Sequence, residues 1–318
     1  MKHAVVILML GLLSIVSANA DMPYIVERPD YVLRAKTGQF QEAVDQAIVS
    51  ARVRLLDILD DSLRLKPDIY IVESLAEFKK LAGTAFPDWG AAAALPYRRL
   101  IVIKSPAHFN LGKPLAELVR HEYSHLALAQ VLGAAVPPRW LDEGLAMYVS
   151  AEWGWQQNLA MSRAVIFRHT VPLHEIERLN RFPEGRAQTA YAQSYLAVKY
   201  ILDTYQAESF NILLKELRGR RSYDEALNMA VGANYVEFEE EFSEFLNRRY
   251  NLVSLFIDTY FLWIFLAVVV FIGFMLQYRK RRKYYQKWEE EEKYRSTDFD
   301  YGDPENPEHI EDEDKPWS

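Results

Sequence analysis

The chain contains no cysteine. This absence excludes disulfide bonds, catalysis by a thiolate and metal sites with cysteine ligands. The chain also lacks an excess of basic residues, because its formal net charge at pH 7 is −7. An acidic balance argues against a nucleic-acid partner. Half of the 318 residues are hydrophobic, which is enough for a substantial core in one large or two small domains.

A short apolar run lies at the start of the chain. Lys2 and His3 precede the hydrophobic stretch Ala4 to Val16, and small residues occupy the cleavage-site positions before Asp21. The run is short for a membrane span, so we predict a cleaved signal peptide over residues 1–20. An uncleaved membrane anchor is the alternative.

A second apolar run, from Thr259 to Leu276, contains no charged residue. It is long enough to cross a bilayer as a helix, and we predict a transmembrane helix over residues 255–278. Five consecutive basic residues follow at 279–283, and the positive-inside rule places them in the cytoplasm. We therefore expect a single-pass protein of a bacterial inner membrane, with its main domain in the periplasm. Residues 279–318, first basic and then acidic, are expected to form a disordered cytoplasmic tail.

The most specific motif is His121-Glu122-Tyr123-Ser124-His125, which has the form H-E-x-x-H. No glycine or proline interrupts Leu115 to Leu132, so we expect the motif on a helix. Residues four apart share one helix face, and the two imidazoles can therefore bind one ion. Glu122 lies beside the first histidine, where its carboxylate can act as the base that metal-assisted hydrolysis requires.

A third metal ligand is available on the next helix. The turn residues Pro137-Pro138 are followed by Arg139-Trp140-Leu141-Asp142-Glu143-Gly144. Glu143 falls near the start of a helix that a short connection packs antiparallel to the first. Its carboxylate can complete a set of two histidines and one glutamate, with the open fourth position that a catalytic zinc site keeps.

Together, the two motifs resemble those of the gluzincin metallopeptidases, specifically the peptidase MA-like group. Aminopeptidases of that clan carry a nearly identical Trp-Leu-Asn-Glu-Gly around their third ligand. The resemblance implies Zn²⁺ bound by His121, His125 and Glu143, with Glu122 as the general base. In this chain 17 residues, 126–142, separate the second histidine from the glutamate, one fewer than in those aminopeptidases.

The resemblance also implies an α+β fold of the thermolysin type, and the sequence patterns agree with it. We predict a small mixed sheet with helices over residues 21–110, followed by a helical zinc-binding lobe over residues 111–252. Before the motif we expect strands at 31–33, 68–72 and 99–103, helices at 39–59 and 74–81, and a loop or irregular edge from Gly83 to Pro96. After the second motif we expect helices at 189–205, 210–218, 222–232 and 236–248.

The expected loop lacks a carboxylate that the aminopeptidases possess. At a comparable position those enzymes carry Gly-Ala-Met-Glu-Asn, whose glutamate binds the free amino terminus of the substrate. The corresponding residues here are Gly90-Ala91-Ala92-Ala93-Ala94. The missing carboxylate therefore favours an endopeptidase over an aminopeptidase, with an exported hydrolase of unknown preference as the alternative. We expect its substrate to be a peptide or protein of the cell envelope.

A tyrosine is the expected donor to the reaction's oxyanion. In gluzincin aminopeptidases a tyrosine at the start of a later helix faces the metal, and Tyr191 matches it in position. A phenol there can donate a hydrogen bond to the oxyanion. An ordinary core tyrosine is one alternative, and Tyr195, one turn later on the same face, is another.

A protein of a different class could use the same scaffold. The alternative is a non-catalytic ectodomain that binds envelope proteins or peptides. The presence of Glu122 disfavours it, because a scaffold without catalysis has no need of that carboxylate.

Overall fold

The computed structural model describes residues 22–59, 63–84, 86, 88, 90–251 and 260–294. The chain divides into two compact units, Met1–Leu255 and Phe256–Ser318. The predicted signal peptide at residues 1–20 lies outside the described residues.

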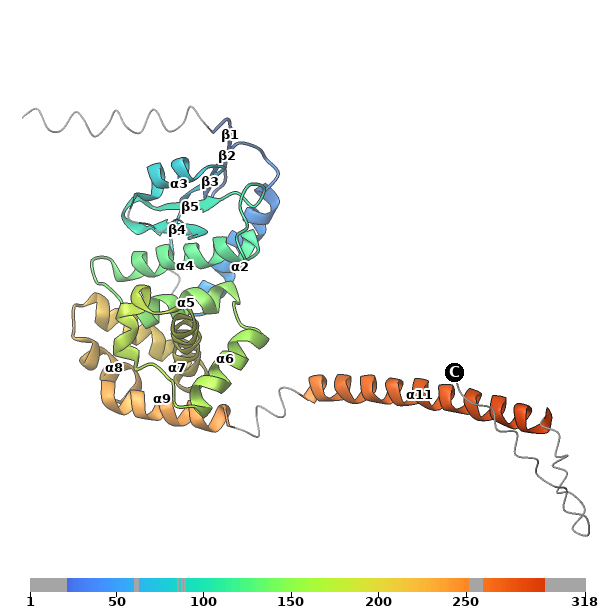
Figure 1. Cartoon of the computed structure of the whole chain (residues 1–318). Helices are drawn as coiled ribbons and strands as arrows, with labels where there is room; N and C mark the ends of the chain where they lie inside the picture. Colours follow the sequence, from blue (N-terminus) through green and yellow to red (C-terminus); the bar gives the residue numbers. More distant parts are fainter. Residues whose placement is uncertain are drawn as a thin grey trace, which may run out of the picture. The chain divides into compact units, whose positions relative to one another are not determined.

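The first unit contains a five-stranded mixed sheet with the strand order β1-β2-β3-β5-β4 (Figure 1). Its strands are β1 Tyr24–Glu27, β2 Val32–Ala35, β3 Asp68–Val72, β4 Ala92–Leu95 and β5 Leu100–Lys104. The β2, β3 and β5 strands are parallel, whereas β1 and β4 are antiparallel to their neighbours. The central strands are apolar because both of their faces are covered, and all five residues of β5 are buried.

The short edge strand β4 refines one prediction. We expected residues 83–96 to form a loop or an irregular edge, and Ala92–Leu95 is a regular edge strand that pairs with β5, with Ala93 opposite Val102. Alanine has a low intrinsic preference for strands, so the local pattern gave no sign of β4. Pairing with a fully buried neighbour supplies the backbone hydrogen bonds that decide its conformation.

Helices make up the rest of the first unit. They are α2 Gln41–Leu56, α3 Leu75–Ala82, α4 Leu115–Leu132, α5 Arg139–Ser150, α6 Trp155–Ile166, α7 Glu184–Arg218, α8 Tyr223–Val231 and α9 Tyr235–Arg249, with the 3₁₀ segments η2 Pro96–Arg98 and η3 Leu173–Arg181. Ser74 and Glu77 form the capping box that their three-residue spacing predicts for α3: the Ser74 side chain accepts from the Glu77 N–H and Glu77 accepts from the Ser74 N–H. The helices predicted at 189–205 and 210–218 are joined as α7, which is kinked at Gln206, where φ is 69°.

One continuous core joins the sheet to the helices. Figure 1 shows α4 below the sheet and α5 below α4. Apolar side chains on one face of the sheet, such as Ile69 and Ile101, pack in the same cluster as Val119 of α4 and Leu145 of α5. A smaller core on the other face of the sheet contains Phe78 of α3. The predicted lobe boundary at residues 110 and 111 falls between β5 and α4, inside this unit.

The residues around Glu143 fix the position of α5. Trp140 is buried and its ring stacks on Phe238 at a centroid distance of 6.1 Å. Gly144 meets α7 at close range: a Cβ atom there would lie 2.2 Å from the carbonyl oxygen of Ser194. The glycine is therefore required for the close approach of α5 and α7, and the tryptophan anchors the start of α5 against α9.

The second unit contains one described helix, α11, which spans Tyr260–Tyr294. Its Leu262–Lys293 stretch is long and apolar enough to cross a membrane, judged by length and composition. Residues 255–259 of the predicted transmembrane helix lie outside the described residues, as does the tail beyond residue 294.

The helix α11 also extends past the predicted boundary at residue 278. We expected disorder from residue 279 onward, but residues 279–294 continue the helix. This stretch is rich in Lys, Arg, Gln and Glu, which have high helix propensity, and contains no glycine or proline. The ammonium of Lys287 lies 3.9 Å from the carboxylate of Glu291, one turn later. The high helix propensity of these residues therefore extends α11 over a stretch whose polar composition alone predicted disorder.

Candidate metal centre

Helix α4 presents both histidines of the H-E-x-x-H motif towards α5. His121 and His125 lie one turn apart, and their ring centroids are 4.9 Å from each other. The opposite side of α4 is apolar and packs into the core through residues such as Val119 and Leu126. Burial of that side orients the helix, so the imidazoles lie together on the α5 side.

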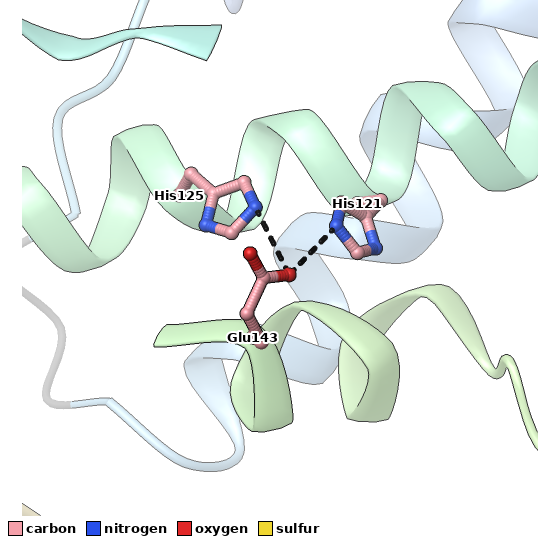
Figure 2. A group of neighbouring side chains, drawn as sticks. All are labelled: His121, His125 and Glu143. Carbon is pink, nitrogen blue, oxygen red and sulfur yellow. Dashed lines mark ion pairs between the residues drawn. The ribbon is translucent and has the colours of Figure 1, made fainter. Parts of the chain in front are cut away.

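Glu143 of α5 completes the group. Its Oε2 atom lies 3.5 Å from Nε2 of His121 and 4.0 Å from Nε2 of His125. Figure 2 shows both dashed lines ending on the same carboxylate oxygen. The three ligand atoms all lie within 4.8 Å of one another. Ligands of tetrahedral zinc at bond lengths of about 2.0–2.2 Å are roughly 3.3–3.6 Å apart. The distance from His121 to Glu143 already matches this range, and the distance from His125 to Glu143 is a few tenths of an ångström longer.

Each imidazole also contacts a carboxylate through its other ring nitrogen, Nδ1. The Nδ1 atom of His125 lies 2.6 Å from Oδ1 of Asp142, and Nδ1 of His121 lies 2.6 Å from Oε1 of Glu152. A carboxylate on Nδ1 fixes the ring orientation and leaves Nε2 as the ligand atom. The sequence motifs alone assign no role to either acid. Asp142 adjoins the expected ligand, but no spacing pattern points to Glu152, which follows the end of α5.

Glu152 has further partners that keep it ionised. It is 6% exposed, accepts a hydrogen bond from Oγ of Ser150 at 2.7 Å and pairs with the ammonium of Lys113. Burial opposes ionisation, but the hydrogen bond from His121 and the charges of His121 and Lys113 lower the pKa of Glu152 to about 2. The carboxylate behind His121 is therefore negative throughout the neutral range.

The charges of the site also shift the pKa values of two of the candidate ligands. Burial raises the pKa of Glu143, but contacts with His121, His125 and Arg139 outweigh it and lower that pKa to about 2. Burial lowers the pKa of His121, but contacts with Glu143 and Glu152 outweigh it and raise that pKa to about 10. A divalent cation that binds here displaces imidazole protons, so binding releases protons and strengthens as the pH rises.

Glu122 lies next to His121 on α4 and is not one of the three residues in the candidate metal-binding group. Its side chain is 9% exposed, and burial raises its pKa, although the charges of His121 and His125 act in the opposite direction. A carboxylate whose pKa is shifted towards neutrality is a stronger base than an ordinary glutamate. The arrangement therefore provides a proton acceptor next to a group that can bind a cation.

Tyr191 and Tyr195 have different surroundings. Burial and the nearby charge of Glu143 raise the pKa of Tyr191, and the nearby charge of Arg139 acts in the opposite direction. Tyr195 instead stacks on Trp153 at a centroid distance of 4.5 Å. Of these two phenols, Tyr191 is the one beside the metal-ligand group, and it remains protonated as a hydrogen-bond donor.

Comparison with known proteins supplies an independent assignment. A sequence model described as the peptidase MA superfamily matches residues 47–248, more than half of the chain. The matched stretch includes both motifs and the strands and helices that position them. A search among curated proteins finds no match. The resemblance predicted from the two motifs is confirmed: the chain belongs to the peptidase MA superfamily.

Proposed function

We propose that the chain is a zinc metallopeptidase that hydrolyses peptide bonds. The observation that carries this proposal is the convergence of Nε2 of His121, Nε2 of His125 and Oε2 of Glu143 on one point. Two imidazoles and one carboxylate suit zinc and leave a fourth position for the reaction. Membership of the peptidase MA superfamily supports the same activity.

The buried residues of the site have separate roles in the proposed reaction. A bound zinc ion would polarise the scissile carbonyl and lower the pKa of water. Glu122 accepts a proton from the attacking water at its carboxylate and later gives that proton to the leaving amine. Tyr191 donates its hydroxyl to the oxyanion that develops on the substrate carbonyl. Asp142 and Glu152 hold the imidazoles in position through Nδ1.

The substrate is proposed to be an internal stretch of a peptide or protein. The Gly90–Ala94 stretch carries no carboxylate that could bind a free amino terminus. It leads into β4, an edge strand that packs against α4. An extended chain can pair with a free strand edge through main-chain hydrogen bonds, and this mode requires no substrate terminus.

Peptides with a blocked amino terminus should therefore be cleaved as readily as unblocked ones. We expect cleavage at internal bonds of both, with rates that agree to within a few-fold. Mass spectrometry of the products from matched acetylated and free peptides measures this. Stepwise loss of single residues from free peptides, with acetylated peptides inert, would refute endopeptidase action.

We also propose that α11 anchors the protein in a bacterial inner membrane, with the first unit in the periplasm. The apolar stretch of α11 has the length of a membrane span. The basic residues 279–283 that follow favour the cytoplasmic side. The export signal expected at residues 1–20 would also place the first unit outside the cytoplasm.

The absence of native cysteine makes this orientation directly testable. Tyr97 is fully exposed on the first unit, and Trp288 of α11 is 67% exposed. In right-side-out membrane vesicles an impermeant maleimide should label Tyr97→Cys. The Trp288→Cys variant should react only after detergent opens the membrane. The cysteine-free parent chain controls for background, and the reverse labelling pattern would contradict the orientation.

A further inference from the structure

Arg139, the first residue of α5, binds the side of Glu143 that faces away from the imidazoles. Its Nη2 atom lies 2.7 Å from Oε1 of Glu143, whose side chain is 5% exposed. Oε2 of the same carboxylate faces Nε2 of both histidines (Figure 2). The two carboxylate oxygens therefore have different partners: one faces the metal-ligand point and the other faces a guanidinium.

The position of Arg139 is itself fixed from several directions. Its backbone N–H donates to Oε1 of Glu177 at 2.7 Å, which links the start of α5 to η3. The neighbouring Trp140 is anchored in the core. The guanidinium also lies near Tyr191, because its charge lowers the pKa of that phenol against the raising effect of burial. Among the described residues, the ion pair of its charged group is with Glu143.

We infer that Arg139 is a positioning residue that would make Glu143 a one-oxygen metal ligand. This inference rests on the proposed function. A carboxylate with two free oxygens can bind a metal through both and so occupy an additional coordination position. The planar guanidinium holds an oxygen in a fixed direction. With Oε1 held in this way, the fourth position stays open for the reaction.

The positive charge of Arg139 predicts the direction in which its removal changes metal affinity. Removing a carboxylate behind a metal ligand usually weakens metal binding about 10–100-fold. Arg139 carries the opposite charge and repels a divalent cation. Its removal should leave metal affinity unchanged or raise it, while the loss of the open position lowers kcat. A purely structural role would weaken both together.

The experiment uses the full chain in detergent, loaded with Co²⁺ in place of zinc. Cobalt absorbs visible light more weakly as its coordination number rises. In Arg139→Met we expect weaker absorption, an unchanged or lower dissociation constant for Co²⁺, and a kcat lower by about 10–100-fold. Arg186→Met is the matched control, because Arg186 pairs with Glu175 elsewhere on the protein. Circular dichroism establishes that each variant is folded.

Two results would overturn the inference. One is an unchanged cobalt spectrum, whatever happens to kcat. The other is a dissociation constant that rises in parallel with the loss of kcat. Should Arg139→Met not fold, Arg139→Gln is measured and interpreted in the same way. The cobalt spectrum does not depend on catalysis. A wild-type chain that hydrolyses no peptide would therefore refute the proposed function, and the cobalt spectrum would still test the role of Arg139.

Discussion

Glu122→Gln should abolish peptide hydrolysis while the metal site stays intact. The substitution preserves the size and polarity of the side chain but removes the proton acceptor. Loss of a positioned general base lowers the rate by about 10²–10⁴-fold. Because Glu122 is 9% exposed and burial raises its pKa, a neutral amide relieves the cost of burying a charge. The variant should therefore be at least as stable as the parent.

Hydrolysis of a blocked peptide, zinc content and thermal unfolding, measured on one preparation, test this prediction. Glu117→Gln is the matched control, because Glu117 lies on the same helix and is not a metal ligand. It should retain activity and zinc. Full activity in Glu122→Gln would end the proposed mechanism. A wild-type chain that binds peptides without cleaving them would instead favour the non-catalytic ectodomain.

Glu143→Ala should abolish the stabilisation that zinc gives to the folded protein. A metal at a thousand times its dissociation constant stabilises a protein by about 4 kcal/mol. For a unit of this size, each kcal/mol raises Tm by about 2–4 °C, so zinc should raise the Tm of the wild type by roughly 8–16 °C. The variant loses the ligand oxygen, and its Tm should not respond. Its metal-free form should also be less stable, because Arg139 loses a buried partner.

Differential scanning calorimetry after removal of metal with a chelator, followed by zinc titration, measures both effects. Glu175→Ala is the control, because it removes a glutamate that is paired with an arginine but lies outside the metal-ligand group. It should keep the full response to zinc. A zinc-induced shift of the same size in Glu143→Ala would mean that this carboxylate is not a ligand.

The features determined by the sequence alone are those that depend on local spacing. The four-residue interval between His121 and His125 places both on one face of any uninterrupted helix. The short proline-marked connection then brings Glu143 to the same place. Apolar periodicity and the Ser74 capping box likewise predicted helices that the structure contains. The apolar run of α11 was evident for the same reason.

Other features were decided only by tertiary structure. The β4 strand exists because β5 pairs with it, and a run of alanines does not reveal that partner. Tyr191 and Tyr195 share one helix face, so periodicity could not separate them. The packing of α7 against α5 at Gly144 places Tyr191 beside Arg139 and Tyr195 on Trp153.

The contacts that hold the metal ligands in position were also decided only by tertiary structure. Glu152 reaches His121 from 31 residues away, and Lys113, from the segment before α4, pairs with it. Arg139 turns one oxygen of Glu143 away from the imidazoles. The spacing of ligands along a helix is a property of the backbone, which the sequence encodes locally. The orientation of each ligand depends on charged groups that only the packing of separate segments brings together.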